Sequence, residues 1–170
     1  RVIKSKNERF DEGDLVNGFV GWQTHLISNG KGFTKVPEIL PIPTMINVLG
    51  LTGITAYYGL LDVGQPTEGD TVVVSGAAGA TGSVVAQIAK IKGCNVIGIA
   101  GGEEKCAWLE ECGLDHVIDY KATKATKEVG RIAKNGIDIY FDNVGGPLLE
   151  AVLFKINLNA RIVICGAISN

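Results

Sequence analysis

The sequence lacks several features that mark whole classes of protein. No apolar run approaches the ~18 residues that a membrane-spanning helix requires, and the amino terminus lacks the charged-then-apolar pattern of a secretion signal. The 16 basic and 18 acidic residues leave a net charge of -2, which gives no basic surface to follow nucleic acid or an anionic membrane. We therefore expect no membrane partner and no nucleic-acid partner.

Cysteine is scarce, and its spacing does not suit a metal. The sequence shows no closely spaced cysteine pair for a structural zinc and no set of three Cys, His or carboxylate ligands for a catalytic one, so we predict no metal site. A disulfide stays open, but free thiols in a reducing, cytoplasmic setting are the interpretation that we favour. The four cysteines are Cys94, Cys106, Cys112 and Cys165.

Glycine, by contrast, is abundant. The 23 glycines cluster in short loops between apolar runs, which is typical of an α/β protein rather than of a disordered chain. Residues 1–45 carry prolines, glycines and short apolar stretches, which predict strands and loops. From Ile46 to Leu61 apolar residues recur at helical spacing, with a bend expected near Gly50 and Gly53. We place a domain boundary between these two patterns.

A regular alternation of strands and helices begins at residue 70. Continuous apolar segments suit strands that are covered on both faces, and most are followed by a glycine-bounded helical segment. The order predicts an α/β fold over residues 46–170, with a doubly wound parallel Rossmann sheet. Strands are expected over 71–74, 95–100, 116–118, 137–141 and 161–165, and a polar helix or loop over 122–134.

The loop after the first of these strands is the main candidate binding site. Gly79 would let the backbone approach phosphates, and Gly82 would let the following helix pack closely on the strand, while free N–H groups at the helix start face the anion. A tight turn without a ligand would carry the same glycines. The placement between an apolar strand and an amphipathic helix favours a dinucleotide pyrophosphate site formed by Gly79, Ala80, Thr81 and Gly82.

The end of the second strand bears on the choice of dinucleotide. NAD sites usually carry Asp or Glu there to hold the ribose 2′-hydroxyl, whereas this sequence has Ala100-Gly101-Gly102. Small residues leave room for a 2′-phosphate, and Lys105 can neutralise it. Lys105 could instead be an exposed lysine paired with a nearby glutamate, so the residues favour NADP(H) over NAD and leave the second open.

Four sequence blocks, taken in order, resemble one enzyme family. They are 49–61 (LGLTGITAYYGLL), 77–85 (AAGATGSVV), 140–146 (YFDNVGG) and 164–169 (ICGAIS). Together they are similar to the prostaglandin reductase branch of the zinc-independent medium-chain dehydrogenase/reductases, which includes curcumin reductase-like and alkenal reductase-like proteins. Many members have Ala where this chain has Gly76, which exchanges one small residue for another. The resemblance makes residues 1–45 a remnant of the family's barrel-like, GroES-like catalytic lobe.

The resemblance also implies a reaction and a site. The reaction is hydride transfer from NADPH to the C=C bond of α,β-unsaturated aldehydes or ketones. Lys105 and Tyr120 would flank the adenosine 2′-phosphate, and Thr55 would lie near the nicotinamide. Asn143 and the segment after the fifth strand would lie along the nicotinamide half, and that segment is Cys165, Gly166, Ala167, Ile168 and Ser169. The catalytic residues stay unknown, because the family's substrate-facing tyrosine has no counterpart among the matched positions.

Three alternatives remain beside the enone reductase. They are a quinone reductase of the same superfamily, an alcohol dehydrogenase of that superfamily, and a non-catalytic fragment that only binds NADP(H). The family has more of the lobe before the position of Arg1 and a sixth sheet strand after Asn170. We therefore expect strand order 3-2-1-4-5 with the fifth strand as an exposed edge. We also expect the chain to bind NADP(H) but to turn over enones poorly. A homodimer is possible.

Overall fold

The computed structural model of the protein describes residues 1–37 and 41–169. The chain separates into two compact units, Arg1–Gly50 and Leu51–Asn170. The first unit contains strands and loops, as its sequence predicts, although each strand is only two residues long. A salt bridge of 2.7 Å joins Lys35 and Asp14 within it. Its elements are the antiparallel strand pair β1 (Val16–Asn17) and β2 (Thr34–Lys35), and the 3-10 helix η1 (Ile42–Met45).

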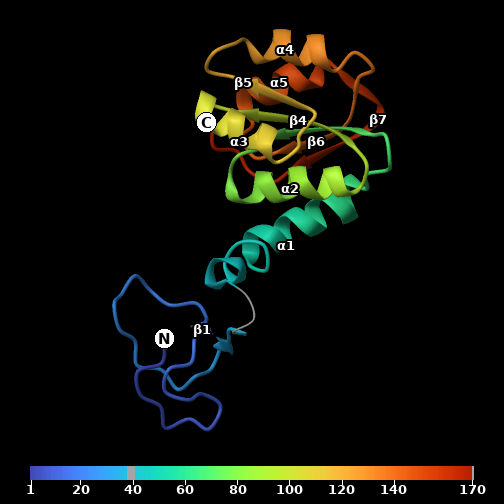
Figure 1. Ribbon diagram of the computed structural model, residues 1–170. Helices are drawn as coiled ribbons and strands as arrows, with labels where there is room; N and C mark the ends of the chain where they lie inside the picture. The colour runs from blue at the N-terminus through green and yellow to red at the C-terminus, as the bar shows by residue number, and fades with distance from the viewer. Residues whose placement is uncertain (38–40, 170) are drawn as a thin grey trace. The chain divides into compact units, whose positions relative to one another are not determined.

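The second unit contains one five-stranded parallel sheet with helices on both faces (Figure 1). The strand order β5-β4-β3-β6-β7 is the predicted 3-2-1-4-5 arrangement, with β7 at an edge of the described sheet. Its elements are α1 (Leu51–Tyr58), the π-helical segment η2 (Gly59–Gly64), β3 (Thr71–Ser75), α2 (Ala80–Ile91), β4 (Asn95–Ala100), α3 (Glu103–Glu111), β5 (His116–Asp119), α4 (Ala125–Ile132), β6 (Ile137–Asp142), α5 (Gly146–Leu153) and β7 (Ile156–Ile164).

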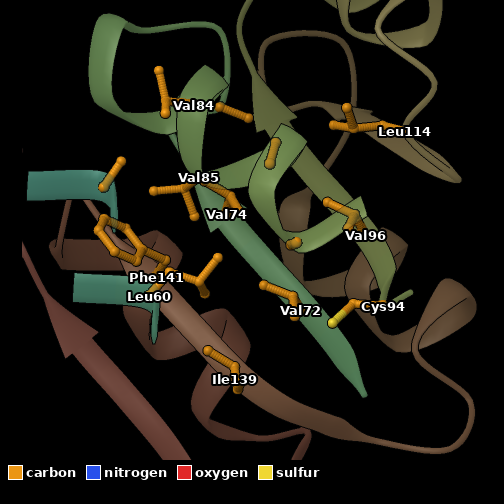
Figure 2. Packing of buried hydrophobic residues seen from close by; sticks show 14 of the residues in the cluster. Leu60, Val72, Val74, Val84, Val85, Cys94, Val96, Leu114, Ile139 and Phe141 are labelled. Atoms are coloured by element: carbon orange, nitrogen blue, oxygen red, sulfur yellow. The ribbon is translucent and has the colours of Figure 1, made fainter. Parts of the chain in front are cut away.

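The core consists of two apolar clusters, one on each face of the sheet. Val72 and Val74 on β3 pack in the cluster that α1, α2 and α3 cover, and Phe141 on β6 joins them (Figure 2). Val73 and Tyr140, which alternate with these residues, belong to the cluster under α4 and α5. Both faces are therefore buried, which explains why the central strands are continuously apolar.

Two elements differ from the sequence prediction at their starts. The helix expected from Ile46 begins at Leu51, after a series of turns. The last strand begins at Ile156, five residues before the expected start. Its early part is irregular, because Asn159 adopts a positive φ of 63° and the pairing with β6 shifts register between Ile137 and Ile139.

The segment over 122–134, for which the sequence allowed a helix or a loop, forms the helix α4. Across the described ranges, 1–37 and 41–169, no helix has the length and apolar character that crossing a membrane would need.

Candidate cofactor-binding site

A cavity of about 940 Å³ lies in the second unit, where β3, β4 and β6 end. This is the edge at which open parallel sheets bind their ligands, and the volume is at the upper end for small-molecule sites. Nine of the thirteen residues predicted to bind the cofactor line it. They are Gly79, Ala80, Thr81, Gly82, Lys105, Tyr120, Asn143, Ile168 and Ser169.

The glycine loop brings backbone atoms close to the cavity because glycine has no side chain. Gly76 has a φ of +58°, and its carbonyl oxygen accepts a hydrogen bond from Gly79 N at 2.9 Å. A Cβ at Gly82 would collide with that same carbonyl oxygen and lie 3.0 Å from Ala77 Cα. The start of α2 therefore packs directly on the end of β3. The first N–H groups of a helix lack intrahelical partners, so those of α2 could bind an anion, which stays a prediction.

The predicted adenosine side of the cavity holds Lys105 and Tyr120. Lys105 is exposed on the first turn of α3, and within the described ranges it forms no ion pair, so the alternative pairing with a glutamate is not realised. A Cβ at Gly101 would lie 2.7 Å from the Tyr120 ring, so the tyrosine ring lies against the end of β4 where glycine leaves space. The small residue thus makes room for the ring.

Asp119 fixes the two loops that carry this corner. Its Oδ1 accepts hydrogen bonds from Gly102 N at 3.0 Å and from Lys121 N at 2.9 Å. These backbone donors, Gly102 first, lower the pKa of the Asp119 carboxyl below its usual range. The loop after β4 and the loop after β5 are therefore joined through one carboxylate, beside Tyr120.

Sequence reasoning missed the start of α4, where residues 123–126 also line the cavity. Lys124 is the one positively charged residue of this four-residue segment, and it forms no ion pair among the residues that the structure describes. The first turn of a helix favours anions. The signal was present in the polar segment 122–134, but the place of this segment in the cavity lining follows from the strand order and not from spacing.

The predicted nicotinamide side contains Asn143, Ile168 and Ser169. Asn143 Nδ2 donates to Ser75 O at 2.8 Å, so the amide is held against the end of β3. Ser169 Oγ donates to Val144 O at 2.8 Å, which joins the segment after β7 to the loop after β6.

Four of the predicted binding residues do not line the cavity. Cys165, Gly166 and Ala167 lie outside the lining. The N–H groups of Cys165 and Gly166 donate to Asp142 O at 2.8 and 3.0 Å. Thr55 lies on α1, where its hydroxyl donates to Leu51 O at 2.7 Å. Their contribution to a bound cofactor stays a prediction.

The described residues, 1–37 and 41–169, contain no group of three His, Cys, Asp or Glu side chains that could hold a metal ion. All four cysteines are free. Burial raises the pKa of the Cys94, Cys106 and Cys165 thiols, which favours the protonated form over the thiolate that binds metals. The predicted zinc independence stays a prediction.

Comparisons with known proteins place the chain in a family. The family model for zinc-binding dehydrogenases matches residues 80–170, and a model for the N-terminal domain of oxidoreductases matches residues 1–36. The chain belongs to the zinc-binding dehydrogenase family, whose members are the medium-chain dehydrogenase/reductases.

Within that family, the relatives lie in the predicted branch. Prostaglandin reductase 1 of Mus musculus is 48% identical, over 99% of this chain and 53% of its own length. The NADPH-dependent curcumin reductase of Escherichia coli K12 is 44% identical, over 100% and 50%. The chain thus spans about half the length of these curated relatives. The resemblance to the prostaglandin reductase branch is confirmed.

The solved structures agree with the sequence relatives. CurA from Vibrio vulnificus in complex with NADPH matches with a TM-score of 0.88 and 48% identity, over 95% of this chain and 49% of that chain. The predicted α/β fold is therefore confirmed by the sheet topology and by a solved relative.

Proposed function

We propose that the protein is an NADPH-dependent oxidoreductase that transfers hydride to the C=C bond of α,β-unsaturated aldehydes or ketones. One observation carries the proposal: the glycine loop, the Lys105–Tyr120 corner and the Asn143 loop line a single cavity at the carboxyl edge of the sheet. Support comes from the relatives, since one is named NADPH-dependent curcumin reductase and another, 40% identical in Nicotiana tabacum, 2-alkenal reductase (NADP(+)-dependent).

The residues present fit NADP(H), because glycines stand where a Cβ would fill the cradle. Residues 79–82 would hold the pyrophosphate with backbone N–H groups. Lys105, Tyr120 and, by its position in the lining, Lys124 would hold the adenosine 2′-phosphate. Asn143, with the segment 165–169, would lie along the nicotinamide half. When bound, the cofactor supplies the hydride; the protein binds it, orients it and excludes water.

Three further statements belong to the proposal. We assign residues 1–45 to the GroES-like catalytic lobe, which the oxidoreductase N-terminal match over 1–36 supports. We place the protein in the cytoplasm, which its free cysteines support. We expect a mechanism without zinc and a small-molecule substrate.

A quinone reductase is the second candidate. A solved mycobacterial quinone oxidoreductase matches with a TM-score of 0.70 and 29% identity, over 81% of this chain and 43% of that chain. The enone reductases share more of the sequence, and they are therefore preferred.

Binding and product analysis test the proposal together. We expect saturable NADPH binding by the folded protein, followed in cofactor fluorescence, and transfer of deuterium from labelled NADPH to the β-carbon of an enone. Enone, quinone and secondary alcohol are assayed in parallel. Consumption of quinone but not of enone would favour the second candidate, and a folded sample with no saturable NADPH binding would overturn the cofactor assignment.

Lys105→Ala tests the choice of cofactor. Loss of one charge-assisted contact to phosphate should weaken NADPH binding by ~1–3 kcal/mol and leave NADH binding nearly unchanged. Lys127→Ala is the matched control, since Lys127 is an exposed lysine outside the cavity lining. Titration of both cofactors measures the effect. An equal loss for NADH and NADPH contradicts a contact with the 2′-phosphate.

A further inference from the structure

A buried carboxylate lies at the end of β6, directly before the Asn143 loop. Asp142 is only 1% exposed. Its Oδ1 accepts four hydrogen bonds: from Ser75 Oγ at 2.8 Å, Tyr140 Oη at 2.9 Å, Val144 N at 3.0 Å and Gly145 N at 2.9 Å. One oxygen atom therefore gathers donors from the two central strands and from the loop that lines the cavity.

The other oxygen of this carboxylate has an unfavourable effect on the free energy of folding. Within the described residues, Asp142 Oδ2 is buried and has no hydrogen-bond partner. Burial raises the pKa of the Tyr140 hydroxyl, so that group stays a protonated donor. A buried polar atom without a partner costs free energy, and replacing buried charged groups by apolar residues of similar volume is often neutral or stabilising. A role in stability is therefore a weak explanation for Asp142 at this position.

The hydrogen bonds of Asp142 extend to the rest of this edge. Ser75 Oγ, which donates to Asp142, accepts in turn from Asn143 N at 2.9 Å. The Asp142 main-chain oxygen accepts from Cys165 N and Gly166 N. The end of β3, the loop after β6 and the segment after β7 are thus joined through one residue.

The loop that Asp142 holds has an unusual backbone. Gly145 and Gly146 have φ angles of +73° and +55°, a region that glycine adopts without strain but does not prefer over others. Such a loop keeps one shape only where hydrogen bonds fix it, and here the bonds to Val144 N and Gly145 N do so. Val144 and Gly145 both line the cavity.

We propose that Asp142 is a positioning residue for the cofactor: its buried carboxylate holds residues 143–146 in the shape that receives the nicotinamide half of NADPH. The inference rests on the proposed function and assigns this residue a role within the same site. Asp142 is not in the cavity lining, so it acts through Asn143, Val144 and Gly145.

The other end of the cavity provides an internal reference. The Lys105–Tyr120 corner is fixed by Asp119. Among the residues that the structure describes, the hydrogen-bond partners of the Asp142 carboxylate lie on β3, on β6 and in the loop after β6, and none lies on α3, β5 or α4. Replacing the Asp142 carboxylate by an amide, whose oxygen is a weaker acceptor for these four donors, should therefore affect the nicotinamide half and spare the adenosine half. A residue with a merely structural role would not separate the two halves.

Asp138 offers a matched control on the same strand. It lies four positions earlier, at the opposite end of β6, where Oδ2 accepts from Thr71 N at 2.8 Å and Oδ1 from Asn157 Nδ2 at 2.7 Å. Asp138→Asn thus makes the same chemical change in a carboxylate of the same strand that accepts two hydrogen bonds and does not line the cavity.

The test compares wild type, Asp142→Asn and Asp138→Asn in the full chain. Urea unfolding is measured for each, with titrations of NADPH and of adenosine 2′,5′-bisphosphate, which carries the adenosine half alone. We expect Asp142→Asn to weaken NADPH binding by about tenfold and to change bisphosphate binding by less than about twofold. Asp138→Asn should leave both affinities within about twofold, although both variants lower the unfolding midpoint.

The outcomes separate the proposals. Loss of both affinities in Asp142→Asn, or of neither, overturns the positioning role while the proposed function stands. A wild-type protein that binds neither probe overturns the proposed function and this inference with it. If Asp142→Asn does not fold, Ser75→Ala takes its place, because it breaks the link between Asp142 and Asn143 and keeps the carboxylate; the same selective loss is expected.

Discussion

At the scale of single residues, the candidate site depends on glycines, which carry no side chain. Gly82 lets α2 begin against the Gly76 carbonyl, and Gly101 lets the Tyr120 ring lie on the end of β4. In both places a Cβ would meet atoms that belong to the site itself. At these two places the candidate binding surface is formed by backbone and by one aromatic ring, which suits a large planar and anionic ligand.

Gly82→Ala tests this packing. The added Cβ would meet backbone atoms of Gly76 and Ala77, which cannot rotate away, so we expect a loss of ~1–3 kcal/mol in unfolding free energy. Gly130→Ala is the control, because Gly130 lies in the helix α4 and its added Cβ would lie 3.5 Å from Lys155 Cε, an ordinary contact. We expect this variant to gain ~0.5–1 kcal/mol in unfolding free energy. Urea unfolding measures both. A Gly82→Ala protein as stable as wild type contradicts the close approach.

Residue types and spacing predicted much of the lining and missed part of it. Gly79, Lys105 and Asn143 could be found because each follows a recognisable strand. Lys124 could not, because it lies in a polar segment whose place in the cavity lining depends on how β4 and β5 pair. Thr55 was expected near the nicotinamide and does not line the cavity.

At the scale of elements, polar side chains join helices to strands behind the site. Asp115, just before β5, accepts from Lys90 Nζ on α2 at 2.7 and 2.8 Å and from Val96 N on β4 at 2.7 Å. Burial opposes the charge of Asp115, but the hydrogen bonds from Lys90 and Val96 outweigh it and lower the pKa of the carboxyl. This carboxylate thus fixes the end of α2 against two strands.

The pH dependence of stability tests this link. A carboxyl whose pKa is lowered by folding adds stability above its unfolded pKa, near 4, and that stability is lost as pH falls through the lower, folded pKa. Asp115→Asn should therefore reduce stability at neutral pH and flatten the fall in unfolding free energy below about pH 4. Urea unfolding across this range measures it. The same acid slope in wild type and variant would falsify the assignment.

At the scale of the whole molecule, the chain has two compact units, and every residue that lines the candidate site belongs to the second. Residues 51–170 also contain both apolar clusters of the sheet. The first unit contains only two strands of two residues each among its described positions. Cofactor binding is therefore expected to be a property of the second unit.

Expression of residues 51–170 alone tests this division. We expect one cooperative unfolding transition and an NADPH affinity close to that of the whole chain, because the core and the cavity lining are both retained. Circular dichroism and NADPH titration provide the measurements. A folded fragment that has lost NADPH binding would show that residues 1–50 take part in the site.

By itself, the sequence determined the order of strands and helices and the position of the glycine loop, and it led us to expect a 2′-phosphate, since these depend on neighbouring residues and on local periodicity. Only the tertiary structure decided which distant residues meet. Ser75 and Asp142 are 67 positions apart, and they are hydrogen-bonded because β3 and β6 are adjacent in the sheet. Strand pairing also brings Lys124 to the cavity. The sequence could not show this, because no local pattern encodes which strands become neighbours.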